Sequence, residues 1–111
     1  MKIRNNNPLD LEGNDGEVII VEVRAFGTNH AVNYNLDGIG GRLNAAPNLV
    51  FTLNKATHDP SILVMFFTFT TNNGGVYEIE LTGSAGGRSH YTVTQLPNLA
   101  ANAIAYTIDV I

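Results

Sequence analysis

The chain has 111 residues, of which 6 are Lys or Arg and 10 are Asp or Glu, giving a net charge of −4. This length suits a single domain, residues 1–111, and is too short for two. There is no cysteine, which excludes a disulfide framework and any thiolate nucleophile or metal ligand. The basic residues are scattered along the sequence, so we expect no nucleic-acid partner, whose phosphates would call for a basic stripe.

Asparagine is the unusual part of the composition. The chain holds 14 Asn, 11 Gly and 10 Thr, which together are 35 of the 111 residues. Asn and Gly tolerate positive φ angles, and Thr favours extended backbone, so this mixture is typical of short strands joined by tight turns. No apolar pattern of helical period runs beyond two turns. The composition therefore predicts an all-β fold.

The sequence shows no targeting segment or membrane span. The N-terminus, Met1–Pro8, starts with basic residues but lacks the apolar stretch of a signal peptide. The longest uninterrupted apolar run, Ile62–Phe67, is six residues, far short of the ~20 that cross a bilayer. We expect no membrane partner, and a location that is cytoplasmic by default or that of a secreted domain trimmed of its leader.

Seven segments are predicted to form β-strands, most of them with alternating apolar and polar residues. They are Glu17–Phe26, His30–Leu36, Asn48–Asn54, Ser61–Thr71, Val76–Thr82, Ser89–Gln95 and Ala103–Val110. A short edge strand at Lys2–Arg4 would be the eighth. Strands of this kind with short connections predict a single-domain antiparallel β-sandwich of seven or eight strands, with a closed barrel as the alternative.

The turn after the most apolar segment carries a family resemblance. Asn73, Gly75 and Tyr77 follow the acid-or-amide, Gly, Tyr spacing that precedes strand F, and this passage resembles immunoglobulin-like domains. The resemblance implies a tyrosine whose hydroxyl pins the corner by bonding to upstream backbone, and an immunoglobulin-like topology. It covers about 20 residues and departs from the family at Ile79, where antibody-type domains have their second cysteine, and in the absence of Trp. It implies nothing about function.

The segment Ile62–Phe69 is apolar on both of its faces, although one side of each strand in a two-layer sandwich meets water. A bare apolar strand face would be an aggregation hazard. Three explanations stay open: a β-bulge that shifts the register, coverage by the chain's own N-terminal segment, and a second subunit. Under the last, Val64 and Phe66 form a homo-oligomer interface.

Oxygen-bearing side chains crowd one short segment near the N-terminus: Asp10, Glu12, Asn14, Asp15 and Glu17. Calcium takes six to eight oxygen ligands, and a loop of alternating acids can supply them. The segment does not fit an EF-hand loop, because its glycine comes one position late and Val21 stands where the final glutamate belongs. The two interpretations are a calcium site formed by Asp10, Glu12, Asn14 and Asp15, and a solvated acidic turn without any cofactor.

The three histidines, His30, His58 and His90, are the side chains whose unperturbed pKa lies closest to neutral pH. No two are at the i, i+2 or i+4 spacing of a local metal pair. His30 and His90 each lie near the start of a predicted strand, so they could face each other at one end of the sandwich. Together with Asn29 and Arg88 they form the candidate ligand-binding set; the alternative is exposed or capping histidines.

Two patterns point weakly to catalysis. The loop Gly83–Gly87 has the glycines and the serine of a phosphate loop or nucleophile elbow, but both motifs need a helix to follow, and a hairpin is predicted here instead. Glu78 and Glu80 share one face of a strand, about 7 Å apart, as a pair of glycosidase carboxylates could be. A shallow groove on so small a domain excludes water poorly, so we expect a charged outer face and no enzyme activity.

Two functions of different classes remain. The first is a non-catalytic binding or interaction module whose ligand is a protein or a carbohydrate, since Asn- and Gly-rich loops suit hydrogen bonding. The second is a structural or assembly subunit, such as a small virion or surface-appendage protein, which the doubly apolar strand and the Asn- and Thr-rich composition favour. The binding module is the preferred prediction.

Overall fold

The computed structural model describes residues 1–26, 30–36, 39–43, 48–56, 62–71, 75–95 and 102–111, and within them the side chains of residues 1–24, 35, 49–56, 78–92 and 104–111. This part of the chain holds ten β-strands and no helix, which confirms the predicted all-β fold. The strands are β1 (Lys2–Arg4), β2 (Asn7–Gly13), β3 (Val18–Phe26), β4 (His30–Leu36), β5 (Ile39–Leu43), β6 (Asn48–Thr52), β7 (Ile62–Thr71), β8 (Gly75–Gly83), β9 (Arg88–Gln95) and β10 (Asn102–Val110).

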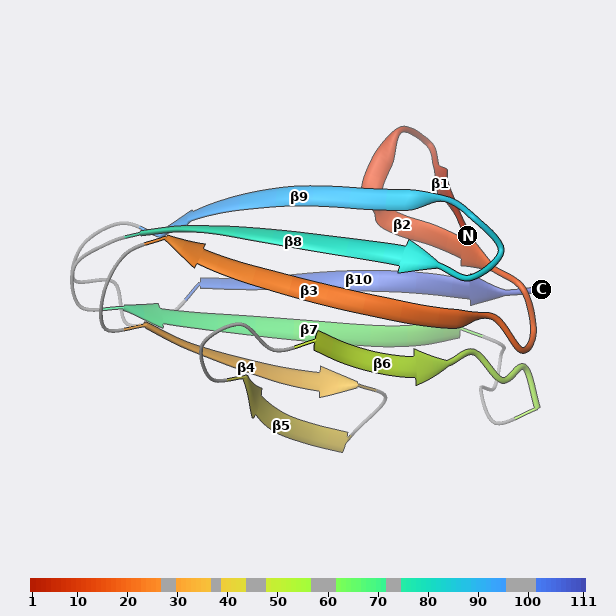
Figure 1. The fold of residues 1–111 in the computed structure, drawn as a ribbon, viewed down its shortest axis with the longest axis horizontal. Coiled ribbons are helices and arrows are strands. Elements are labelled where there is room, and N and C mark those ends of the chain that lie inside the picture. The colour runs from red at the N-terminus through yellow and green to blue at the C-terminus, as the bar shows by residue number, and fades with distance from the viewer. Residues whose placement is uncertain (27–29, 37–38, 44–47, 57–61, 72–74, 96–101) are drawn as a thin grey trace.

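The strands form two sheets that stack face to face (Figure 1). One has six strands in the order β1-β2-β10-β7-β4-β5, and the other has four in the order β6-β3-β8-β9. Two parts of the prediction need correction. The described residues hold ten strands instead of seven or eight, and the two that were not among the predicted segments are β2 and β5. The sheets are also not wholly antiparallel, since β10 pairs parallel to β2.

The two missed strands contain residues that usually mark turns. In β2, Pro8 and Gly13 flank an acidic stretch, which suggested a loop. The same stretch alternates, with Leu9 and Leu11 packing on the core and Asp10 half-exposed, as a strand with one buried face requires. In β5, two of the five residues are glycines, and glycine is depleted in strands.

Asparagines at one hairpin turn show why this residue is so frequent. Asn5 and Asn6 connect β1 to β2, with φ angles of 56° and 54°. A two-residue hairpin loop with positive φ at both positions matches the right-handed twist of the strands that it joins. Asn reaches this conformation more easily than most residues do. At this turn Asn adopts the positive φ that the composition led us to expect of turns, although the turn itself was not predicted.

The hydrophobic core lies between the two sheets. Its fully buried side chains come from both layers: Leu11, Ile19, Val21, Leu53, Ile79, Leu81, Tyr106 and Ile108. The alternation predicted for the segments Glu17–Phe26 and Val76–Thr82 is confirmed in β3 and β8, because the apolar residues Ile19, Val21, Ile79 and Leu81, at every second position, are all buried. Burial raises the pKa of the Tyr106 hydroxyl above its ordinary value. Because alternate residues of β3 and β8 are buried, the residues between them lie on the outer face of the four-stranded sheet.

The N-terminal hairpin closes one side of the sandwich. Strand β9, the edge of the four-stranded sheet, lies beside β1 and β2 of the other sheet (Figure 1). The buried Ser89 hydroxyl donates a 2.6 Å hydrogen bond to the Pro8 carbonyl oxygen, joining β9 to β2. The edge of β9 is thereby covered, as sheet edges in stable proteins usually are.

Several parts of the predictions lie outside the described residues. Asn73 of the immunoglobulin-like corner, Asn29 of the ligand-binding set and His58 belong to undescribed positions. The strands of four further predicted residues are described but their side chains are not: His30, Val64, Phe66 and Tyr77. The corner tyrosine and the topology that it implies stay predictions.

Candidate functional site

Charged side chains gather on the outer face of the four-stranded sheet. We call this set the charged face: Glu22 and Arg24 of β3, Glu78 and Glu80 of β8, and Arg88 and His90 of β9. The register of the strands aligns them, because Glu22 pairs with Glu80 and Glu80 with His90 in one row. They alternate with the buried positions of the same strands, so the pattern that forms the core also forms this face.

Arg24 is the centre of the charged face. Its guanidinium lies 2.7 Å from the Glu22 carboxylate, 3.3 Å from that of Glu80 and 3.5 Å from that of Glu78. Desolvation lowers the Arg24 pKa, but hydrogen bonds to Glu78 and Glu80, together with the negative charges of Glu22 and Glu80, outweigh it, and the pKa is raised. Carboxylates directly opposite each other across two strands repel, and Arg24 offsets this repulsion between Glu22 and Glu80.

Arg88 and His90 extend the charged face to the edge strand. The Arg88 guanidinium is 3.3 Å from the same Glu80 oxygen that Arg24 contacts, and the His90 Nε2 is 3.7 Å from Glu78. Both side chains are exposed. The structure thus places these two members of the predicted ligand-binding set on one face, in contact with the glutamates that were expected to form a charged outer face.

His30, the other histidine of the predicted set, lies in the other sheet. It begins β4 and pairs with Thr71 of β7, whereas His90 lies near the start of β9, the edge strand of the four-stranded sheet, and pairs with Glu80. The last residue of β3, Phe26, pairs with Val76, which pairs with Thr94 at the other end of β9, and β4 follows β3 at that end (Figure 1). The strand positions therefore do not bring His30 and His90 together at one end of the sandwich, as we had expected.

Two exposed apolar side chains adjoin the charged face. Val50 of β6 is 57% exposed and Ile20 of β3 is 39% exposed, and the two are directly opposite each other in the register. Ile20 is two positions before Glu22 on the same face of β3, so the apolar pair and the charged residues form one continuous surface.

The acidic side chains of the segment predicted as a calcium site each contact a different partner. Asp10 binds Arg4 at 3.0 Å, Glu12 lies 3.5 Å from Lys2, and Asp15 accepts a 3.0 Å hydrogen bond from the Lys55 backbone N–H. Among the described residues no three acidic or histidine side chains form a group that could hold a metal ion. The segment does not converge into the predicted cluster, and calcium binding stays a prediction.

Arg4 ties three strands of the six-stranded sheet together. Besides Asp10 of β2 it binds Asp109 of β10 at 2.9 Å. Hydrogen bonds from Arg4 and Asn5 lower the pKa of Asp10 below its ordinary value. The contacts fasten the N-terminal hairpin to β10, so these carboxylates serve the fold.

The last acid of the segment, Glu17, forms a buried ion pair with the Met1 ammonium that was not predicted from the sequence. Its carboxylate accepts hydrogen bonds of 3.0 and 2.7 Å from the Met1 ammonium, 3.0 Å from the Asn14 N–H and 3.2 Å from the Ala85 N–H. The Glu17 side chain is 1% exposed. Desolvation would raise the Glu17 pKa, but these hydrogen bonds outweigh it, and the pKa is below its ordinary value.

The loop Gly83–Gly87 encloses this ion pair. It is the β8–β9 hairpin that the sequence predicted, and the Gly86 carbonyl oxygen accepts a 3.1 Å hydrogen bond from the Met1 ammonium. Side chains are excluded at two positions, because a Cβ on Gly83 would overlap the Glu17 carboxylate and one on Gly87 would overlap the Met1 carbonyl oxygen. The glycine-rich loop holds a cation inside the protein, in contrast to a phosphate loop.

The Ser84 hydroxyl in the same loop is hydrogen-bonded to the backbone. Its oxygen accepts a 3.0 Å hydrogen bond from the Val18 N–H, which links the hairpin to β3. A nucleophilic serine needs a base that takes its proton, and the contact that the structure gives this hydroxyl is a backbone donor.

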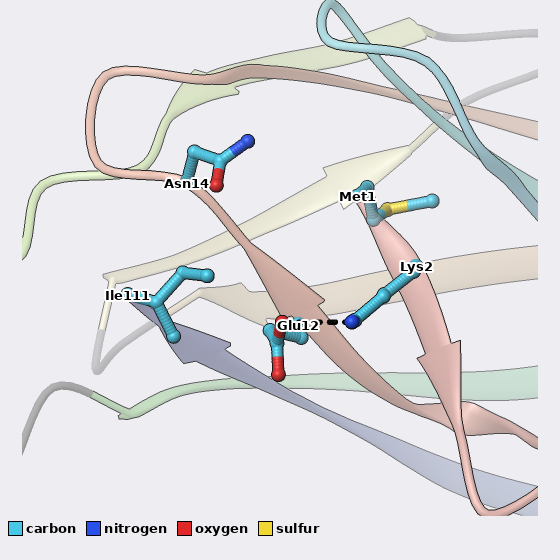
Figure 2. A pocket seen from close by; sticks show the side chains of 5 residues that line it. All are labelled: Met1, Lys2, Glu12, Asn14 and Ile111. Atoms are coloured by element: carbon cyan, nitrogen blue, oxygen red, sulfur yellow. Dashed lines mark ion pairs between the residues drawn. The ribbon is translucent and has the colours of Figure 1, made fainter.

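A shallow cavity of about 230 Å³ lies beside the N-terminus (Figure 2). It is lined by Met1, Lys2, Glu12, Asn14 and Ile111. Figure 2 shows Lys2 and Glu12 pointing toward each other across one side of it, at the 3.5 Å ion pair. Apart from this pair its walls offer little convergent polar chemistry, and the charged face is the more extensive candidate.

Comparison of the chain with family models, with curated proteins and with solved structures found no match. None of the described segments forms a helix of the length and hydrophobicity that a membrane span requires. The case for a function therefore rests on the chemistry of the site.

Proposed function

We propose that the protein is a non-catalytic interaction module that binds a protein partner through the charged face. The observation that carries the proposal is the network around Arg24, which holds Glu22, Glu78 and Glu80 in one array between two strands. Groups fixed before binding lose little conformational freedom when a partner arrives, and such preorganisation favours specific recognition.

The composition of the face supports a protein partner over a carbohydrate. Among the residues whose side chains are described, the outward positions of the charged face hold no aromatic ring, and Tyr91 of β9 packs toward the core instead. Arginine is enriched at protein interfaces, and both Arg24 and Arg88 lie on this face. Three glutamates against two arginines, on a chain of net charge −4, suit a partner with a basic surface.

The proposal that the module is not an enzyme rests on the same contacts. Glu78 and Glu80 share one face, as predicted, but both carboxylates are ion-paired with Arg24. In a glycosidase the two carboxyl groups flank the scissile bond, whereas here both carboxylates contact the same guanidinium on one face of a strand.

A charge reversal on the charged face tests the proposal. Glu80→Lys removes the shared partner of Arg24 and Arg88, and Glu12→Lys makes the same change on the other sheet at nearly equal exposure, 19% against 21%. The experiment is affinity capture from an extract of the source organism, with both variants checked for folding by circular dichroism.

We expect one or more proteins to be retained by the wild type and by Glu12→Lys, and to be lost with Glu80→Lys or when ionic strength is raised. Equal retention of the partner by the wild type and both variants, or loss of the partner only with Glu12→Lys, would refute the charged face as the binding surface.

A structural or assembly subunit is the second candidate, and the register of β7 favours it. Phe66 pairs with Ala105 of β10 and Asn35 of β4, and both of these residues are exposed. We propose that Val64 and Phe66 form the subunit interface in that case. Sedimentation velocity of the wild type and of Phe66→Asp is the test: a larger species that Phe66→Asp dissociates supports assembly, and a monomer at every concentration opposes it.

A further inference from the structure

The two edges of the four-stranded sheet differ in how they are protected. The β9 edge carries Arg88 and His90 and lies against the N-terminal hairpin through Ser89. The β6 edge is Asn-Leu-Val-Phe-Thr, residues 48–52, with no charge and no proline. In the part of the chain that the structure describes, β6 pairs with β3 alone. An uncharged edge strand of this kind is a ready template for another strand.

The sequence of β6 is self-complementary about its central residue. Polar Asn48 and Thr52 flank the strand, apolar Leu49 and Phe51 come next, and Val50 stands at the centre. Leu49 and Phe51 are half-buried and pack on the core, whereas Val50 and Thr52 are exposed. A two-fold axis at Val50 would set Leu49 opposite Phe51 of the second copy on the inner face, and would set position 48 opposite position 52 in the register.

The same axis would cover the exposed apolar pair beside the charged face. Val50 would lie directly opposite its own copy, with Ile20 next to it in each sheet. Four apolar side chains would then form one patch across the junction, and cross-strand pairs of β-branched residues stabilise sheets. None of the paired β6 residues is charged. The seam therefore sets no like charges opposite each other, although the chain as a whole has a net charge of −4.

We propose that a second copy of this chain pairs antiparallel with β6 about a two-fold axis at Val50, joining the two four-stranded sheets into one continuous sheet. The occupant is another copy of the same chain, because the pattern of β6 complements itself. The pairing concerns the sheet edge and does not depend on the binding function proposed for the charged face.

Disulfide trapping tests the register directly, because the chain has no native cysteine. Residues directly opposite each other in antiparallel strands have Cβ atoms about 4.5 to 5.5 Å apart, close to the span of a disulfide. Val50→Cys places two thiols opposite each other. Thr52→Cys is the matched control, since residue 52 and its copy would be four positions apart, about 13 Å.

With oxidised glutathione at micromolar protein, we expect Val50→Cys to form a covalent dimer at least about tenfold faster than Thr52→Cys. The reaction is followed on non-reducing gels. Equal rates for the two variants, or no dimer with Val50→Cys, would overturn the proposal.

A second pair of variants tests the same contact without a covalent bond. Val50→Lys sets two ammonium groups opposite each other, whereas Thr52→Lys keeps them apart, and both sites are exposed on the same strand. Sedimentation velocity should show a dimer for the wild type and for Thr52→Lys and a monomer for Val50→Lys. A dimer that Val50→Lys leaves intact, or a wild-type monomer at every concentration, would contradict the pairing.

Discussion

Replacing Glu17 by Gln is the sharpest test of how the N-terminal segment is held. The carboxylate accepts two hydrogen bonds from the Met1 ammonium and one each from the N–H groups of Asn14 and Ala85. The amide of Gln has one acceptor oxygen and one NH₂ donor. Whichever way it is turned, the NH₂ group meets donors, and the ammonium loses the charge that balances it.

The expected loss of stability follows from the burial of this pair. Removing one partner of a buried ion pair leaves an uncompensated charge, which costs about 3 to 5 kcal/mol. The Glu17 side chain is 1% exposed, so water cannot replace the lost contacts. For a chain of this size we expect the melting temperature to fall by roughly 12 to 20 °C.

Urea and thermal unfolding at pH 7, followed by circular dichroism, measure the effect. Glu12→Gln is the control, because its partner Lys2 is 72% exposed and exposed pairs contribute at most about 1 kcal/mol. One glycine added before Met1 gives an independent check, since it turns the ammonium into a neutral amide. In that extended chain Glu17→Gln should have a smaller effect, because the pair is already broken.

Equal losses for Glu17→Gln and Glu12→Gln would refute this reasoning. So would a full, undiminished effect of Glu17→Gln in the extended chain, since the coupling between carboxylate and ammonium would then be absent.

Two further predictions concern the same region. Gly86 and Gly87 both have positive φ, but a Cβ at residue 86 would meet open space, whereas one at residue 87 would overlap the Met1 carbonyl oxygen. Urea denaturation should therefore show a loss of about 1 to 2 kcal/mol in the free energy of unfolding for Gly86→Ala and of about 3 kcal/mol or more for Gly87→Ala. The reverse order would contradict the role of the loop in enclosing the N-terminus. The lowered pKa values of Glu17 and Asp10 predict stability that is complete above about pH 5 and declines as the pH falls below about 4, through their folded pKa values. Unfolding at pH 7, 5 and 3 should show a weaker pH dependence for Glu17→Gln, and an unchanged dependence would exclude Glu17 as its source.

The parts of the fold that the sequence predicted are those where local pattern decides. Alternation in β3 and β8 placed Ile19, Val21, Ile79 and Leu81 in the core, because a strand with one buried face must repeat with period two. The hairpin at Gly83–Gly87 followed from its glycines. The β2 strand was missed because Pro8 and the neighbouring acids resemble a turn, although Leu9 and Leu11 carried the alternating signal.

The candidate site could be predicted only in part, because its contacts join distant segments. Glu78 and Glu80 were placed correctly on one outer face, but their link to Arg24 depends on the pairing of β3 with β8, 54 residues along the chain from Arg24 to Glu78. The ion pair of Glu17 and Met1 was not predicted for the same reason, because its two residues are 16 positions apart in the sequence. The one signal that could have suggested it is the phase of Glu17, which falls on the same inward face as Ile19 and Val21.

Photo-crosslinking from one residue of each outer face tests the proposed binding surface most directly. Thr82 of β8 borders the charged face and Thr107 of β10 lies in the six-stranded sheet, and both side chains are half-buried. A photoreactive phenylalanine analogue replaces one or the other, and adducts formed in an extract of the source organism are identified by mass spectrometry. The proposed function predicts a specific protein adduct from position 82 that position 107 does not give. The same adducts from both positions, or an adduct from position 107 alone, would contradict binding through the charged face.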